Sequence, residues 1–311
     1  ISVINKIGYE IYNMGNHEFN FGMDKLIKVV RQFDGISMMG NLYKKDDHRP
    51  MNGVYIKSFG QVKIGFISLT TPLVRHFEEK SGNLKDFIVE NADVELTRLL
   101  KEVSQYNPDA IIGIFHMGDT NENLIENTGI RDLLYNVEGS SEITAIFGGH
   151  MHQQIEGMRI NKTIFMEPGS KGQALNRLDI TFDTSQGNKI VDVSSSLIQI
   201  DESVESDPEI EEYLMPYHTK IRDYVNEHIG YVEGADLRPE DEVKGIPQIR
   251  VGQTDITDFF LEVMLHYSKA DVVATHLDNP YAQLPAGEIR RKHIYDSYSC
   301  LLYTSPSPRD S

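Results

Sequence analysis

The segment Gly-Asn-His-Glu-Phe-Asn at residues 15–20 carries side chains that could bind a metal ion next to a phosphate group. Asn16 offers a neutral amide oxygen, which suits a hard or borderline dication without adding charge. His17 can place a proton or a positive charge beside a phosphoryl oxygen. Gly15 allows a tight turn directly after a strand. The hexapeptide is the most specific signal in the sequence, and it predicts a metal site at this turn.

Two further segments place histidines directly after apolar runs. His116 follows the run Ala-Ile-Ile-Gly-Ile-Phe, and His150 and His152 follow a Gly-Gly pair. On an extended strand, His-x-His would point its imidazoles to opposite sides, but after a Gly-Gly turn both rings can approach neighbouring ions. Imidazole and oxygen ligands suit Mn, Zn, Fe or Co rather than Ca. One histidine beyond a strand is more often a hydrogen-bonded structural residue, so the metal prediction rests on the three segments together.

Apolar periodicity predicts the elements that position these segments. Helical spacing occurs near the start of the chain and at residues 24–33 and 89–106. The last of these helices should turn five apolar side chains inward: Val94, Leu96, Leu99, Leu100 and Val103. Strands are expected at residues 62–69, 110–115, 144–147, 163–166, 178–182 and 190–200. This order indicates a layered α/β domain, whose ligands would arrive at the carboxyl ends of the strands.

The chain divides into four predicted parts. The α/β domain covers residues 1–201 and a linker helix lies within residues 202–228, starting at the Asp207-Pro208 pair. A second, smaller α/β domain follows at residues 229–299. Residues 300–311 are rich in Ser and Pro and contain the sole cysteine, so we expect them to be a non-native tail.

Composition limits the classes of partner. The net charge is −17, from 30 basic and 47 acidic side chains, which argues against a groove that wraps a polynucleotide. A small phosphate ester is not excluded, because a bound dication can dominate the local field. Cys300 alone cannot form an internal disulfide. No apolar run approaches the roughly 20 residues of a membrane span, and the oligomeric state is left open.

Taken in order, Gly-Asn-His-Glu, His-Met-Gly and Gly-Gly-His-x-His resemble the motifs of the calcineurin-like metallophosphoesterase superfamily. Residues 7–22 and 167–182 are similar to one branch of it. That branch contains bacterial 5′-nucleotidases, UDP-sugar hydrolases and 2′,3′-cyclic-nucleotide 2′-phosphodiesterase/3′-nucleotidases. The resemblance covers residues 1–200 well and residues 229–299 more loosely. It implies a metallophosphoesterase β-sandwich flanked by helices, followed by part of a C-terminal substrate domain.

The resemblance also implies which residues hold two divalent metal ions. Asn16, His116 and His150 would bind the second metal, and His152 would be a ligand of the first. The first metal of the family also uses an Asp-x-His segment, and a further Asp bridges both ions. These lie upstream of Asn16, where this chain has fifteen residues and none of these ligands. We therefore expect a chain truncated at both ends, with phosphatase activity at or near background.

Three other residues receive roles by resemblance. His17 would stabilise the transferring phosphoryl group or assist the leaving group, and Asn41 would stand behind the ligands. The 5′-nucleotidases usually have Asp three residues after the catalytic histidine, where this chain has Asn20. Loss of that carboxylate should make His17 less readily protonated. The motif with Asn favours 2′,3′-cyclic nucleotides and 3′-nucleotides as substrates.

Several alternatives remain open from the sequence. The parent protein could be a 5′-nucleotidase or UDP-sugar hydrolase, or a hydrolase of thiosulfonate esters on a related scaffold. From another class, the chain could be a catalytically incomplete fragment that binds at most a metal or a nucleotide. The resemblance implies a small-molecule nucleotide as partner and a periplasmic, cell-surface or extracellular location in a bacterium.

Overall fold

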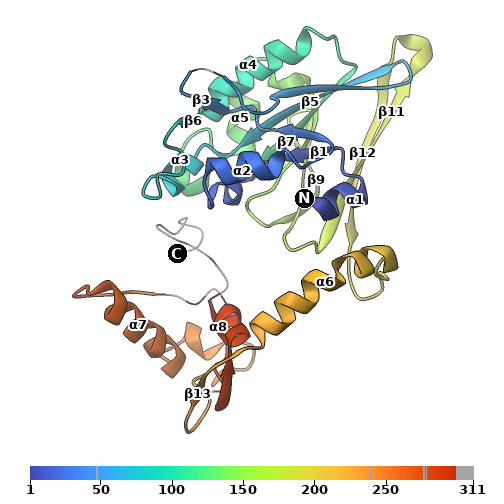
Figure 1. Cartoon of the computed structure of the whole chain (residues 1–311). Coiled ribbons are helices and arrows are strands. Elements are labelled where there is room, and N and C mark those ends of the chain that lie inside the picture. The colour runs from blue at the N-terminus through green and yellow to red at the C-terminus, as the bar shows by residue number, and fades with distance from the viewer. Residues whose placement is uncertain (47, 239, 276, 278, 299–311) are drawn as a thin grey trace. The chain divides into compact units, whose positions relative to one another are not determined.

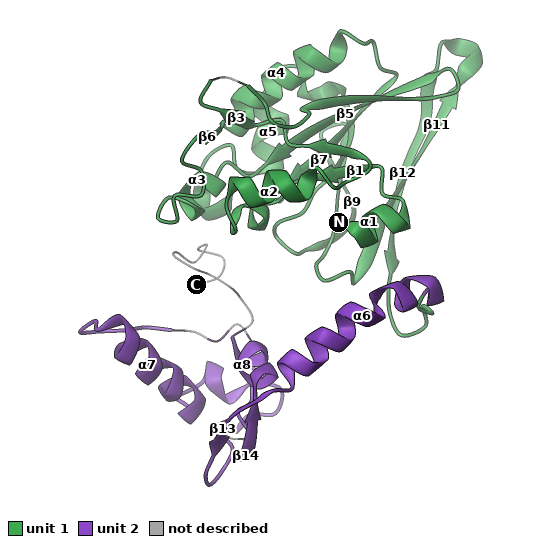
Figure 2. Ribbon diagram, in the orientation of Figure 1, with its two compact units in different colours: residues 1–206 green, residues 207–311 purple. Residues whose placement is uncertain are grey.

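The computed structural model describes residues 1–46, 48–238, 240–275, 277 and 279–298, so the predicted tail 300–311 lies outside the described part. Two compact units make up the chain, residues 1–206 and 207–311 (Figure 2).

A six-stranded mixed sheet forms the centre of the first unit (Figure 1). Its spatial order is β4-β5-β7-β8-β10-β9. The four inner strands run parallel, and both edge strands are antiparallel to their neighbours. The strands are β4 (Val54–Phe59), β5 (Val62–Thr70), β7 (Ala110–His116), β8 (Ile143–Phe147), β9 (Gln154–Ile160) and β10 (Thr163–Pro168). Their inner members are continuous apolar runs, as expected for strands covered on both faces.

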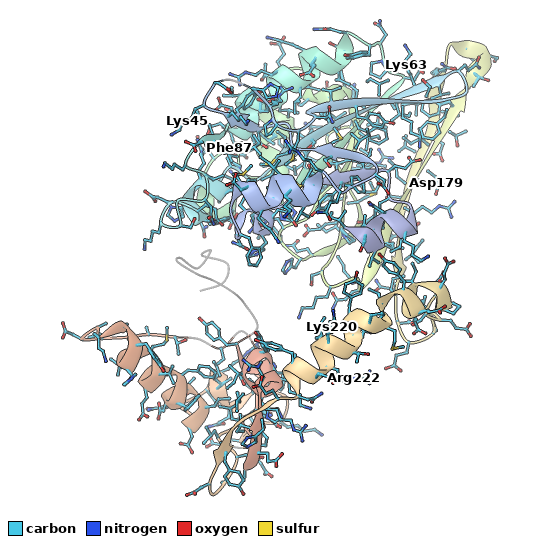
Figure 3. The ribbon with its side chains drawn as sticks, viewed as in Figure 1. Lys45, Lys63, Phe87, Asp179, Lys220 and Arg222 are labelled. Carbon is cyan, nitrogen blue, oxygen red and sulfur yellow. The ribbon has the colours of Figure 1, made fainter. Side chains whose placement is uncertain are left out.

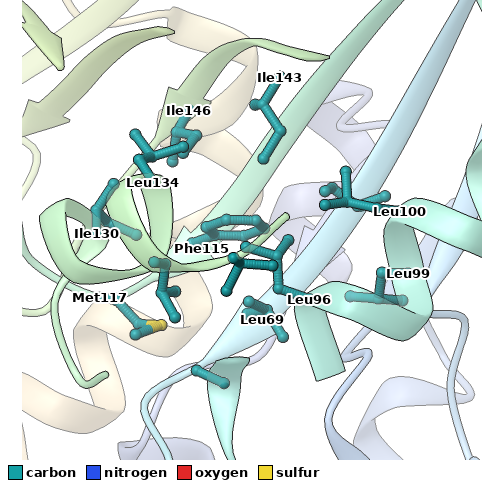
Figure 4. Packing of buried hydrophobic residues seen from close by; sticks show 14 of the residues in the cluster. Leu69, Leu96, Leu99, Leu100, Phe115, Met117, Ile130, Leu134, Ile143 and Ile146 are labelled. Carbon is teal, nitrogen blue, oxygen red and sulfur yellow. The ribbon is translucent and has the colours of Figure 1, made fainter. Parts of the chain in front are cut away.

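Helices cover one face of this sheet. They are α4 (Ala92–Ser104) and α5 (Ile130–Asn136). Leu96 and Leu99 of α4 pack against Phe115 of β7 in one cluster of buried residues (Figure 4). Such a two-layer contact buries the apolar stripe of the helix and fixes β7 from that side.

A long hairpin covers the other face. It consists of β11 (Ala174–Asp183) and β12 (Lys189–Gln199), which pair antiparallel. Leu178 and Ile180 pack with Ile112 and Met166 of the sheet, so the two β layers share a core. The hairpin's outer face mixes exposed apolar side chains, such as Leu175 and Val191, with charged ones such as Asp179 (Figure 3). The predicted layered α/β fold is thus confirmed, with the sheet between helices and a hairpin.

Short elements complete the first unit. They are α1 (Ser2–Ile7), β1 (Ile11–Asn13), α2 (Met23–Val30), β2 (Ile36–Met38), β3 (Leu42–Lys44), α3 (Val74–Phe77) and β6 (Phe87–Val89). β1 pairs parallel with β2, and β3 pairs antiparallel with β6. Met14, directly after β1, is fully buried in a second apolar cluster with Phe19 and Leu42. This cluster anchors the chain on either side of the Gly-Asn-His-Glu turn.

The expected elements are present, but two details are wrong. The helix expected at residues 89–106 begins only at Ala92, and Val89 is the last residue of β6. Asp207 caps α6 (Pro208–Val225) as predicted, because its side chain accepts hydrogen bonds from the main-chain nitrogens of Glu209 and Ile210. Val94 was expected to face inward but is 38% exposed. It lies at the border of the apolar stripe of α4, whose centre is formed by fully buried Leu96 and Leu99. Periodicity locates the stripe but not its width.

The second unit begins with α6 and also contains β13 (His228–Val232), α7 (Asp255–Ser268), β14 (Gly287–Arg290) and α8 (Arg291–Ser297). β13 and β14 pair antiparallel. A small core around Ile256, Leu284 and Ile289 joins β13, α7, β14 and α8. The side chains of α6 are exposed or half-buried, including Lys220 and Arg222 (Figure 3).

Candidate metal centre

The three predicted segments meet at the carboxyl ends of neighbouring strands. β5 and β7 end side by side, with Thr70 opposite His116. The next turn is tied to them, because Gly149 donates its main-chain N–H to the carbonyl of Met117 at 3.3 Å. The Gly-Asn-His-Glu turn joins the same edge, since Thr70 Oγ1 donates a hydrogen bond to the carbonyl of Met14. The sheet therefore brings residues from distant parts of the sequence to one edge, where open α/β sheets place their sites.

Asn16 and His116 are in direct contact. The amide oxygen of Asn16 lies 2.9 Å from Nε2 of His116, and Asn16 is 7% exposed. Gly15 makes this approach possible, because a Cβ at this position would stand 2.8 Å from Cε1 of His116. The amide oxygen can only accept, so the hydrogen between the two groups is carried by Nε2 of His116. A cation can take the place of this hydrogen, because metal binding releases protons from ligands.

His150 completes this group. Its ring centroid lies 5.2 Å from that of His116, and the residue is 5% exposed. Its backbone adopts φ 79°, a left-handed conformation that is uncommon outside glycine. The structure therefore places Asn16 and His150 each next to His116.

Glu122 contacts His150 and was missed in the sequence. Its Oε2 lies 2.8 Å from Nε2 of His150, and the carboxylate side chain is buried. Metal-ligating histidines usually donate one ring N–H to a carboxylate or carbonyl, which fixes the ring and leaves the other nitrogen for the ion. The Glu122 carboxylate is placed to accept such a hydrogen bond from Nε2 of His150. No sequence signal marked it, because it sits in an irregular loop among many other acidic residues.

His152 lies on the exposed side of the same turn, with φ 58°. Buried Glu167, at the end of β10, accepts main-chain hydrogen bonds from Met151, His152 and Gln153. Burial raises the pKa of Glu167 to about 7, and the main-chain donors oppose the rise. Its other oxygen, Oε2, is buried without a hydrogen-bond partner among the described residues. Glu167 thus holds the backbone of the turn that carries both histidines.

His17 and Asn20 form a hydrogen-bonded pair directly after Asn16 in the chain. His17 is exposed, and its Nδ1 lies 2.8 Å from the amide oxygen of Asn20. Both residues belong to a single helical turn around His17–Phe19, in which Asn20 donates its main-chain N–H to the carbonyl of His17. The ring is therefore held by its neighbour three residues on and remains open to solvent.

Glu18 stabilises the turn from within. Its Oε2 accepts a hydrogen bond from the main-chain nitrogen of Gly15 at 2.7 Å, and its Oε1 accepts one from the hydroxyl of Tyr12 at 3.1 Å. Burial and the nearby Glu18 charge raise the pKa of Tyr12 above its usual range, so the hydroxyl stays protonated and keeps donating. Both oxygens of the Glu18 carboxylate therefore take part in hydrogen bonds that stabilise the turn.

Asn41 lies behind the site and is fully buried. Its amide nitrogen donates to the carbonyls of Thr70 and Glu90, and its amide oxygen accepts from the main-chain nitrogen of Thr70. Asn41 thus holds the end of β5, and Thr70 in turn lies opposite His116. Its contacts are with the backbone that supports the ligands.

The donors present fit one divalent ion better than two. Asn16 supplies an amide oxygen beside His116, and His150 supplies a second imidazole next to it, and these donor types suit Mn, Zn, Fe or Co. Among the described residues, however, no three His, Cys, Asp or Glu side chains are grouped so as to hold a metal ion.

No family model matches the chain, but curated proteins with similar sequences include nucleotide phosphoesterases. The trifunctional nucleotide phosphoesterase protein YfkN of Bacillus subtilis is 24% identical, over 96% of this chain and 23% of that protein. A 2′,3′-cyclic-nucleotide 2′-phosphodiesterase/3′-nucleotidase of Haemophilus influenzae is 24% identical, over 74% of this chain and 39% of its own. These curated relatives are named as nucleotide phosphoesterases, the group of enzymes that the sequence motifs resemble.

Solved structures with this fold include nucleotidases. A Staphylococcus aureus protein provisionally named a 5′-nucleotidase superposes with a TM-score of 0.79 at 23% identity, over 96% of this chain and 57% of its own. The chain spans less than half the length of the two curated nucleotide phosphoesterases above. Within the part of the chain that the structure describes, no helix is both long and apolar enough to cross a membrane.

Proposed function

We propose that the protein to which this chain belongs hydrolyses nucleotide phosphoesters with divalent metal ions, and that it prefers 2′,3′-cyclic nucleotides and 3′-nucleotides. The observation that carries the proposal is the convergence of Asn16, His116 and His150 at the strand ends, with His17 beside Asn16. Similarity to a 2′,3′-cyclic-nucleotide 2′-phosphodiesterase/3′-nucleotidase and the Asn at position 20 support the substrate class.

Each residue has a separate task in this proposal. Asn16, His116 and His150 would hold the second metal, and His152 would be a ligand of the first. When bound, the ions would activate water and offset the charge that develops on the phosphoryl oxygens. His17, exposed and held by Asn20, would place a proton or positive charge beside the phosphoryl group or the leaving oxygen. Asn41 and Glu122 would keep the ligands in position.

The test uses the protein encoded by the complete natural gene, assayed with Mn²⁺ or Co²⁺. Its substrates are 2′,3′-cyclic AMP, 3′-AMP and 5′-AMP. We expect turnover of the first two, and His17→Ala should lower turnover more than metal occupancy. His150→Ala should lose metal. Absence of turnover with all three nucleotides, in a protein that binds metal, would overturn the proposal.

A 5′-nucleotidase is the second candidate, because the solved structure that superposes with a TM-score of 0.79 is provisionally named so. The same assay separates the two, since 5′-AMP would then be hydrolysed faster than 3′-AMP. A catalytically incomplete chain is the third candidate. It is favoured by the absence of a three-residue His, Cys, Asp or Glu group among the described residues. Background turnover by residues 1–311 beside strong turnover by the natural protein would support it for this segment.

We further propose that residues 229–299 contribute to a substrate domain and that the natural protein is exported from a bacterial cell. Both rest on the family resemblance. Cell fractionation with an antibody against the chain tests the second, and recovery in the cytosolic fraction alone would contradict it.

A further inference from the structure

A buried carboxylate stands behind Asn20. Glu78 directly follows α3, is 4% exposed, and accepts a hydrogen bond at Oε1 from the side-chain nitrogen of Asn20 at 3.0 Å. Its Oε2 accepts from Ser81 Oγ at 2.6 Å and from the side-chain nitrogen of Asn83 at 2.7 Å. Both oxygens are therefore used as acceptors, which is the only role that an ionised carboxylate has.

This contact fixes which way the amide of Asn20 points. An amide carries donors on nitrogen and only acceptors on oxygen, so the nitrogen must face Glu78. The oxygen then faces Nδ1 of His17, at 2.8 Å. Because this oxygen can only accept, Nδ1 of His17 must carry the hydrogen. The orientation of the Asn20 amide thus follows from its hydrogen-bond partners.

The main chain of Asn20 is held in the same way. The side-chain nitrogen of Asn83 donates to the carbonyl of Asn20 at 3.3 Å as well as to Glu78. Asn20 is therefore fixed to the segment 78–83 through its side chain and its backbone. Glu78 lies 58 residues further along the chain than Asn20, so no local pattern links them.

We propose that Glu78 is a positioning residue for His17, acting through Asn20 in a relay His17–Asn20–Glu78. The relay keeps the hydrogen of the neutral imidazole on Nδ1 and leaves Nε2 as the ring atom that can engage a substrate. A carboxylate that fixes the tautomer of a catalytic histidine is a general device, and here it acts through an intervening amide. The catalytic meaning of the relay rests on the proposed function, whereas its effect on the ring does not.

The ring itself gives the first test. Long-range ¹H–¹⁵N spectra of the metal-free natural protein, labelled at histidine, report the tautomer of each ring, and His17→Ala identifies the signals. We expect Nδ1 of His17 to carry the hydrogen when the ring is neutral. In Glu78→Gln, the new amide can turn either end toward Asn20, so the signals should shift toward a mixture of tautomers. Glu79→Gln is the matched control, because Glu79 is its exposed neighbour and should leave the signals unchanged.

Moving the charge gives the second test. Asn20→Asp alone would place two carboxylates in contact and should disturb the ring. Asn20→Asp combined with Glu78→Gln restores an acceptor beside His17 and a donor beside that acceptor. The double variant should therefore recover the tautomer of the natural protein. It also gives a readout if Glu78→Gln alone does not fold.

Kinetics show whether the relay matters for turnover. With 2′,3′-cyclic AMP, Glu78→Gln should lower kcat about tenfold with little change in KM, and the double variant should recover most of the loss. A His17 ring unchanged in Glu78→Gln would overturn the proposal, and so would a double variant no better than Asn20→Asp. If the spectra follow the expectation while no nucleotide is hydrolysed, the proposed function fails and the relay stands.

Discussion

The amide oxygen of Asn16 lies 2.9 Å from Nε2 of His116, although 100 residues separate them in the chain. The contact depends on two features that belong to neither residue. The absence of a side chain at Gly15 leaves room for the imidazole, and the strand register places His116 beside Thr70. Each of the following predictions changes one such supporting feature.

Gly15→Ala should weaken metal binding. The new Cβ would stand 2.8 Å from Cε1 of His116, a distance that forces the ring or the turn to move. Even outer residues of metal sites cost about 10- to 100-fold in affinity when lost, so we expect a loss of at least this size. Calorimetric titration with Mn²⁺ or Zn²⁺ measures it. Gly230→Ala is the control, because a Cβ there meets no atom within 4 Å. Equal affinities in both variants would contradict the prediction.

Glu122→Gln should lower metal affinity by about 10- to 100-fold with little effect on folding. The amide removes the charge that accepts the ring N–H of His150, so the ring loses its fixed tautomer. The same titration measures the loss. Glu126→Gln is a matched control in the same loop, because Glu126 is exposed. A wild-type affinity in Glu122→Gln would show that His150 is not a ligand or is oriented by other groups.

The metal-free protein should lose stability as the pH rises toward about 7, where Glu167 titrates in the folded state. Its folded pKa is raised, so between the ordinary carboxyl pKa and about 7 the folded chain holds a proton that the unfolded chain has released. The free energy of unfolding then falls with pH, by at most about 1.4 kcal/mol per unit from this group.

Glu167→Gln should flatten this slope, as measured by chemical denaturation at pH 5, 6 and 7. Glu156→Gln changes an exposed carboxylate on the neighbouring strand and should leave the slope as it is. Identical slopes in the two variants would assign the pH dependence to other groups.

Leu96→Ala should destabilise the first unit by about 2–5 kcal/mol, because Leu96 is fully buried between α4 and the sheet. Val94→Ala, on the same helix, should change stability by less than about 1 kcal/mol, since Val94 is 38% exposed. Denaturant unfolding measures both changes, as shifts of the midpoint at an unchanged dependence of the unfolding free energy on denaturant concentration. A larger loss from Val94→Ala than from Leu96→Ala would refute the assignment of the buried stripe.

The sequence indicated the candidate ligand residues because histidines directly after apolar runs form a recognisable pattern. His116 and His150 both follow apolar runs, and such runs become inner strands whose carboxyl ends meet. The carboxylates that support them could not be found in this way. Glu78, Glu122 and Glu167 are three of 47 acidic residues, and their roles come from loop contacts with no fixed spacing in the chain. A contact made by an irregular loop is specified by the whole fold, so a single sequence does not reveal it.

The histidines at 116 and 150 extend from adjacent parallel strands, and their ring centroids lie 5.2 Å apart. His150 lies in the turn after β8, and the hydrogen bond from Gly149 to the carbonyl of Met117 ties this turn to the end of β7, so the main chain sets the spacing of the imidazole pair. Side chains spaced by the backbone need little reorganisation before an ion arrives. Ion binding should then cost little conformational entropy, and selectivity among cations should follow the donor atoms rather than the flexibility of the loops.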